Sequence, residues 1–132
     1  MRTLRRALSD DTGSSPVEFV LVGGLLTLLT FAVLQLALAI YVRNVVHDAA
    51  VEGAFHAALA DTSLEEGVAR TREMVGRAVS ESYAEDVSIV ETTEAGVPSV
   101  RVTVRATLPL IGLLGAPRAM EVNAHAPVES FE

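Results

Sequence analysis

One uncharged run constrains this chain more than any other feature of its sequence. Residues 19–42 contain no Asp, Glu, Lys, Arg or His, and these 24 residues are mainly Leu, Val, Ala, Phe and Ile. A helix that crosses a bilayer needs about 20 predominantly apolar residues. The sequence therefore predicts one transmembrane helix close to the N-terminus.

A single carboxylate stands at the start of this run. Glu18 directly precedes Phe19, the first uncharged residue. A charge costs roughly 2.5–3.5 kcal/mol at the bilayer centre and less near the interface, so a carboxylate at this depth needs a cation. The next arginine, Arg43, follows 25 residues later. At about 1.5 Å per residue it lies on the far side of the membrane, so we expect the cation to come from elsewhere.

The residues in front of the run offer such a cation. A cut between Gly13 and Ser14 would create a terminal ammonium at Ser14 and make Glu18 the fifth residue of the mature chain. Residues 9–13 are polar and end in glycine, which is typical of a flexible loop that a peptidase can reach. Pro16 is compatible with a helix that begins here, because proline is tolerated in the first turn.

The basic residues predict the orientation of the span. Three arginines precede it (Arg2, Arg5 and Arg6), whereas Arg43 is the only arginine between the span and Arg70, and the chain has no lysine. Because loops rich in Lys and Arg stay in the cytoplasm, we expect a cytoplasmic N-terminus and an extracytoplasmic C-terminal domain.

The helix is expected to continue beyond the membrane, from about residue 15 to residue 59. Apolar or small residues recur there with a period of 3.6, which marks a buried helix face: Val42, Val45, Val46, Ala49, Ala50, Gly53, Ala54, Ala57 and Ala58. Small residues on such a face let another helix approach closely. Ser63 and Glu66 form a capping-box pattern that predicts the start of a second helix. Its apolar stripe comprises Leu64, Val68, Val75 and Val79.

Beyond residue 86 the apolar period changes from 3.6 to two, which predicts strands. The alternating segments are 87–89, 100–108 and, more weakly, 120–126, and the turn-rich residues 94–98 separate the first two. We therefore expect an α+β domain with a two- to three-stranded antiparallel sheet covered on one face by helices. The connection over residues 109–118 is unusually apolar. It is interpreted either as a cap on the core or at the membrane surface, or as a subunit contact.

Composition and motifs argue against several functions. A net charge of −7 argues against nucleic-acid binding, and the absence of cysteine excludes disulfides and thiolate metal sites. His47, Asp48, Glu52 and His56 match no metalloprotease spacing, so no metal is expected. His125 is predicted to face solvent. Since neither a nucleophile elbow nor a phosphate loop is present, we expect no enzyme, no cofactor and no small-molecule substrate.

The N-terminal pattern resembles the TadE-like and TadF-like minor pseudopilins of tight-adherence (Flp) pilus systems. The resemblance rests on Gly13-Ser14, on Val17-Glu18-Phe19, on the uncharged span and on the alanine-rich residues 48–54, with Phe55 where the family usually has arginine. It implies a leader, residues 1–13, that a prepilin peptidase removes after Gly13. It also implies a helical segment over 14–60 and a domain over 61–132.

The resemblance further implies a function. The mature protein would stay in the cytoplasmic membrane and support assembly of the major pilin, at the filament base or as a minor component. Glu18 would neutralise the Ser14 ammonium of its own or a neighbouring subunit, Phe19 would fill the usual aromatic position, and other pilins would pack against the N-terminal helix.

Three alternatives remain open at this point. Glu18 could sit in the headgroup layer of an ordinary membrane anchor, which would make the protein a single-span extracytoplasmic binding or regulatory module. Residues 37–39 also satisfy the small-x-small cleavage pattern of a signal peptide, although the apolar stretch is longer than the usual 7–15 residues. A related secretion role would share the same fold and processing.

Overall fold

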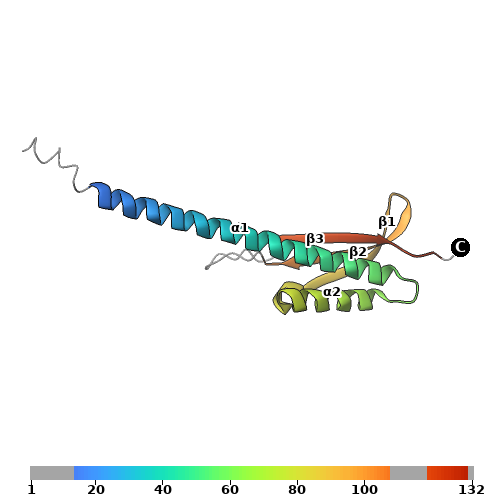
Figure 1. Cartoon of the computed structure of the whole chain (residues 1–132). Helices are drawn as coiled ribbons and strands as arrows, with labels where there is room; N and C mark the ends of the chain where they lie inside the picture. The colour runs from blue at the N-terminus through green and yellow to red at the C-terminus, as the bar shows by residue number, and fades with distance from the viewer. Residues whose placement is uncertain (1–13, 108–118, 131–132) are drawn as a thin grey trace, which may run out of the picture. The chain divides into compact units, whose positions relative to one another are not determined.

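The computed structural model describes residues 14–107 and 119–130 (Figure 1). Two helices, α1 (Ser14–Ala58) and α2 (Leu64–Ala78), and the short 3₁₀ helix η2 (Glu81–Ala84) precede three strands, β1 (Asp86–Glu94), β2 (Val97–Ala106) and β3 (Met120–Pro127). The predicted α+β class is confirmed. The predicted leader and the apolar connection 109–118 lie outside the described residues. The chain divides into two compact units, Met1–Leu36 and Ala37–Glu132, and α1 contributes to both.

In the first unit, α1 exposes apolar side chains around its whole circumference. Between Val17 and Leu34 every large hydrophobic side chain is at least 52% exposed. A helix that is apolar on all sides is typical of a membrane span. By length and composition, α1 is the one helix of the described residues that could cross a membrane.

In the second unit, the small-residue face of α1 is buried inside the chain. The helix that meets this face could not be identified from the sequence, and in the structure it is α2 of the same chain. A Cβ on Gly53 would collide with Oγ1 of Thr71, and a Cβ on Gly67 would lie 2.5 Å from Cβ of Ala57. The two helices therefore cross where side chains are smallest, as small-xxx-small spacing allows.

The capping box at the start of α2 is confirmed. The Ser63 hydroxyl accepts the backbone N–H of Glu66 at 3.2 Å, and the Glu66 carboxylate accepts the backbone N–H of Ser63 at 2.7 Å. Each interaction satisfies a donor that a helix start leaves open. Of the predicted stripe, Val75 is fully buried, while Leu64, Val68 and Val79 pack against the core from its margin.

The sheet is antiparallel in the order β1-β2-β3, which confirms the predicted strands, and within the described residues it has three of them. β1 and β2 are joined at Ala95 and Gly96, both with positive φ (51° and 84°), as two-residue hairpin turns of the primed type require. One face carries the core, whose members are Val42, Val46, Ala49, Ala50, Ala54, Ala57, Ala58, Val75, Ala84, Val87, Val100, Val102, Val104, Ala106, Met120, Val122, Ala124 and Ala126.

The opposite face of the sheet is polar. The Arg105 guanidinium donates to the Glu121 carboxylate at 2.9 Å, and the Thr103 hydroxyl donates to the Asn123 side-chain oxygen at 2.7 Å. Arg101 pairs with Glu94 across the hairpin. His125 is exposed on the same face, as the alternation in the sequence predicted. The sheet therefore has one buried and one solvated side.

Candidate functional site

The predicted processing and assembly residues lie at the N-terminal end of α1. Gly13 is outside the described residues. Among those described, α1 begins at Ser14, and Pro16 stands in its first turn, where its missing N–H would have no helical partner anyway. Glu18 and Phe19 follow within the helix, and the Phe19 side chain is 80% exposed. An aromatic ring this exposed is available to lipid or to a second helix.

One face of this helical end is apolar. Pro16, Val17, Val20 and Leu21 line a shallow hollow of about 440 Å³. Val20 and Leu21 follow Val17 by three and four residues, which makes them its neighbours on the helix surface. The first turns of α1 therefore combine the carboxylate of Glu18 with an apolar surface that nothing in the described chain covers.

The segment that carries these residues has a counterpart among known families. Residues 13–54 match the family model described as TadE-like protein. The matched segment contains both sides of the predicted cleavage site, the uncharged span and Gly53, the glycine at the contact with α2. The N-terminal helix of this chain is therefore similar to that of TadE-like proteins. The resemblance predicted from the sequence is thereby confirmed over this segment.

The match stops within α1, so α2 and the sheet lie outside it. No curated protein and no solved structure matches the chain. The TadE-like family is a structural family associated with the tight-adherence pilus and is not enzymatic. The match therefore carries no information on the function of the domain beyond residue 54.

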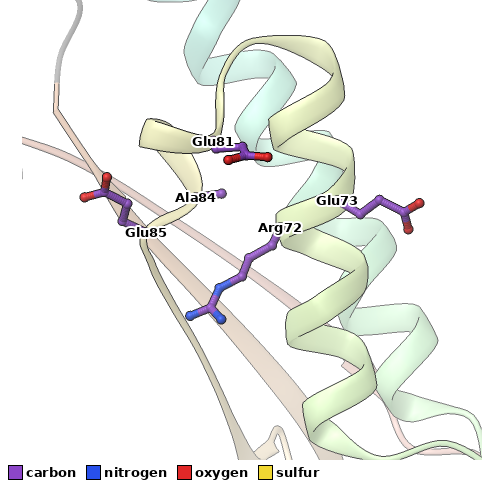
Figure 2. Close-up of a pocket in the computed structure, with 5 residues that line it drawn as sticks. All are labelled: Arg72, Glu73, Glu81, Ala84 and Glu85. Carbon is purple, nitrogen blue, oxygen red and sulfur yellow. The ribbon is translucent and has the colours of Figure 1, made fainter.

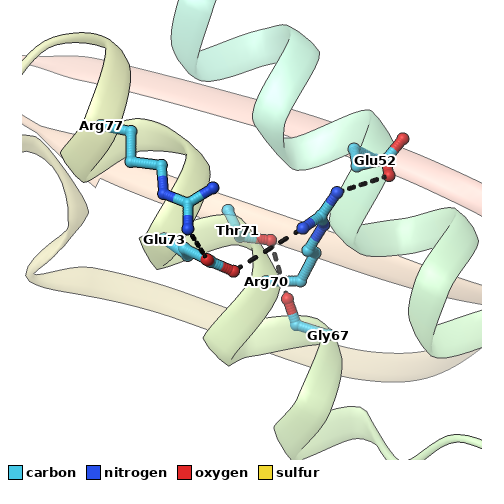
Figure 3. A network of polar contacts seen from close by, with 6 residues as sticks. All are labelled: Glu52, Gly67, Arg70, Thr71, Glu73 and Arg77. Atoms are coloured by element: carbon cyan, nitrogen blue, oxygen red, sulfur yellow. Dashed lines mark hydrogen bonds and ion pairs between the residues drawn. The ribbon is translucent and has the colours of Figure 1, made fainter.

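Ion pairs connect α1 to α2 (Figure 3). Arg70 lies between Glu52 of α1, at 3.4 Å, and Glu73 of its own helix, at 3.6 Å. Arg77 reaches Glu73 from one turn further along. Beneath this exposed network the buried Thr71 hydroxyl donates to the Gly67 carbonyl at 2.9 Å. That bond lies within α2. Exposed pairs contribute about 0–1 kcal/mol each, so the close packing of Gly53 against Thr71 and of Gly67 against Ala57 holds the two helices together more than the network does.

Glu52 and His47, two of the four residues considered as metal ligands, lie in different surroundings. Glu52, one of the four residues considered as ligands, pairs with Arg70. Among the described residues no group of three or more His, Asp or Glu side chains is arranged to hold a metal ion. Arg43, Asn44 and His47 instead line a separate hollow of about 440 Å³ together with Glu121, Val122 and Asn123 of β3.

A cleft of about 500 Å³ lies between α2 and η2 (Figure 2). It is lined by Arg72, Glu73, Glu81, Ala84 and Glu85, and the side chain of Glu73 points away from those of Arg72 and Glu81. One guanidinium and three carboxylates therefore share its lining.

Gly67 and Thr71, which form the α2 half of the helix contact, were not predicted from the sequence. Both are buried, and they are four residues apart, the same spacing as Gly53 and Ala57 on α1. That repeated spacing was the available signal.

Proposed function

We propose that this chain is a membrane-anchored structural subunit that supports biogenesis of a tight-adherence pilus. The observation that carries the proposal is the TadE-like match over residues 13–54, which covers the span and the predicted processing site. The exposed apolar surface of α1 supports it, because such a helix is suited to a single-pass anchor.

Maturation by a prepilin peptidase after Gly13 is part of this proposal. A glycine has no Cβ, so the peptidase can approach the backbone closely at that position. The new ammonium at Ser14 then lies within two turns of Glu18 on the same helix. In a medium of low dielectric constant opposite charges attract far more strongly than in water. Glu18 of one subunit neutralises this ammonium in the same or a neighbouring subunit, with the N-terminus on the cytoplasmic side.

The test is the intact mass of the full chain isolated from its own membranes in cells that contain the peptidase. We expect a chain that starts at Ser14. A start at Met1 would contradict the proposal and leave a plain membrane-anchored binding or regulatory module. A start at Ile40 would mean a secreted domain and would exclude the pilus role.

Two variants separate processing from assembly. Gly13→Val should retain the leader, because a branched side chain obstructs the peptidase at the cut. Glu18→Gln should be cleaved normally but should fail to co-assemble with pilins, since it keeps the shape of glutamate and loses the charge. Normal pilus assembly in Glu18→Gln would contradict the role given to this carboxylate.

A further inference from the structure

A polar hollow of about 440 Å³, the α1–β3 hollow, lies within the second unit of the chain. It is lined by three residues of α1 and three of β3, namely Arg43, Asn44, His47, Glu121, Val122 and Asn123. Two residues beyond the other end of β3, the Glu129 N–H donates to the Ala58 carbonyl at 3.0 Å. The strand therefore runs along α1 in the same direction. The hollow lies where the domain directly follows the uncharged run.

The α1 wall of this hollow consists of exposed donors. The side chains of Arg43, Asn44 and His47 form no hydrogen bond or ion pair with other described residues. Arginines elsewhere in the same domain contact carboxylates, namely Arg70, Arg77, Arg101 and Arg105. Arg43 and His47 are four residues apart and are therefore neighbours on the helix surface. A guanidinium, an imidazole and an amide can thus donate to the same ligand.

The β3 wall adds donors of a different kind. In the described sheet β3 is an edge strand, so alternate backbone N–H groups point away from β2. At least one of the three N–H groups of residues 121–123 is therefore directed outward. The Glu121 carboxylate accepts from Arg105 at 2.9 Å and from Asn123 at 3.2 Å, which compensates its charge. The hollow accordingly suits a small anion with several acceptor oxygens.

The position of the hollow in the chain indicates which anion. Arg43 is the first charged residue after the uncharged run, and the exposed Tyr41 precedes it by two positions. Tyrosine and arginine are typical of the bilayer interface, where the lipid phosphates lie. We propose that the α1–β3 hollow binds the phosphate group of an anionic phospholipid, to which Arg43 and His47 donate. This inference rests on the membrane placement in the proposed function and does not depend on the pilus role.

A nuclear magnetic resonance titration of the full chain in maltoside micelles tests the ligand. Short-chain phosphatidylglycerol should cause saturable shifts at the Asn44 side-chain amide, the His47 ring and the backbone N–H groups of residues 121–123. The ring of His125, on the opposite face of the sheet, should not shift. Shifts that do not saturate, or that are as large at His125, would overturn the proposal.

Two further ligands distinguish the source of the phosphate. Phosphatidylcholine carries a compensating cation beside its phosphate, so it should bind more weakly than phosphatidylglycerol. Inorganic phosphate should also bind more weakly, because it lacks the acyl chains that hold a lipid at this depth. Equal affinity for both lipids would exclude a preference for anionic lipid. Equal or tighter binding of inorganic phosphate would show a site for the free anion and overturn the lipid assignment.

Three variants test whether the hollow itself holds the ligand. Arg43→Gln should weaken phosphatidylglycerol binding about 5-fold, the effect of one arginine close to anionic lipid. Arg43→Lys should retain most of the affinity because it keeps the charge. Arg72→Gln is the matched control, since it removes one positive charge from the cleft between α2 and η2 and should leave the affinity unchanged. Equal weakening in Arg43→Gln and Arg72→Gln would mean non-specific attraction and would overturn the inference.

The two proposals can fail separately. If the natural chain is not retained in phosphatidylcholine vesicles after alkaline washing, the membrane placement fails and this inference fails with it. If the chain is retained but phosphatidylglycerol causes no saturable shift at the α1–β3 hollow, the inference alone is overturned.

Discussion

At the scale of single residues, Gly53 determines how closely α1 and α2 approach. An added Cβ would collide with the Thr71 hydroxyl and lie 3.0 Å from the Gly67 carbonyl oxygen. Gly53→Ala should therefore lower the free energy of unfolding by about 1–3 kcal/mol, the usual cost of overpacking a tight core. Denaturant unfolding of the full chain in detergent, followed by circular dichroism, measures this change.

Gly76→Ala is the matched control on α2. Its Cβ would lie 3.3 Å from Cγ of the flexible Glu81 side chain and in ordinary van der Waals contact, at 3.9 Å, with the Glu81 Cα. Because alanine favours the helix over glycine, stability should stay equal or rise. A Gly53→Ala protein as stable as the natural chain would show that the helices have room to separate. If Thr71→Ala relieves part of the Gly53→Ala loss, the collision is located at Thr71.

At the scale of elements, the capping box holds the first turn of α2. Ser63→Ala removes the hydroxyl that accepts the Glu66 N–H and should destabilise the domain by about 0.5–2 kcal/mol. Ser63→Asp should retain most of the stability, because aspartate is an equally good cap. The midpoint of thermal unfolding reports the difference. Equal losses in both variants would mean that the residue acts through packing and not as a cap.

The elements predicted from the sequence are those whose signals are local. The capping box needs only Ser63 and Glu66, and the strands need only alternation along one segment. The crossing of α1 and α2 depends on which helix meets the small-residue face, and periodicity does not contain that information. Gly53 was recognised as part of such a face, whereas Gly67 and Thr71 were not connected with it.

The same distinction between local signals and contacts of distant segments applies to the candidate site. The TadE-like character of the first helix was predictable because its signal lies within one contiguous segment. Cleavage at Gly13 and the roles of Ser14, Glu18 and Phe19 stay predictions. The buried, unsatisfied oxygen of Gln35 was not predictable, because the burial of a single atom depends on the folded structure and not on a local sequence pattern.

At the scale of the whole molecule, exposed carboxylates on three elements link folding to pH. The pKa of Glu66 lies below its usual value of 4.5 mainly because it accepts the backbone N–H of Ser63. Arg101 lowers the pKa of Glu94, and the Asn123 amide, followed by Arg105, lowers the pKa of Glu121. In each case the folded chain favours the ionised carboxylate more than the unfolded chain does.

The three lowered pKa values determine how the stability of the fold changes with pH. A carboxyl group whose pKa is lower in the folded state stabilises the fold above its unfolded pKa, and this stabilisation is lost as pH falls through the folded value. The urea midpoint of the full chain in detergent should thus be level from pH 7 to about 5 and then decrease towards pH 3. The decrease should be shallow and smaller at high salt, because all three groups are exposed.

A triple variant, Glu66→Gln, Glu94→Gln and Glu121→Gln, tests the assignment. It should be less stable than the natural chain at pH 7, and the two midpoints should approach one another as pH falls and the natural carboxyl groups take up protons. Parallel curves with a constant offset would show that these three groups do not cause the loss of stability in acid. The hydrogen bonds from Ser63, Arg101 and Asn123 would then stabilise the neutral and the ionised carboxyl groups equally. That result would be unexpected, because hydrogen bonds to an ionised acceptor are normally the stronger ones.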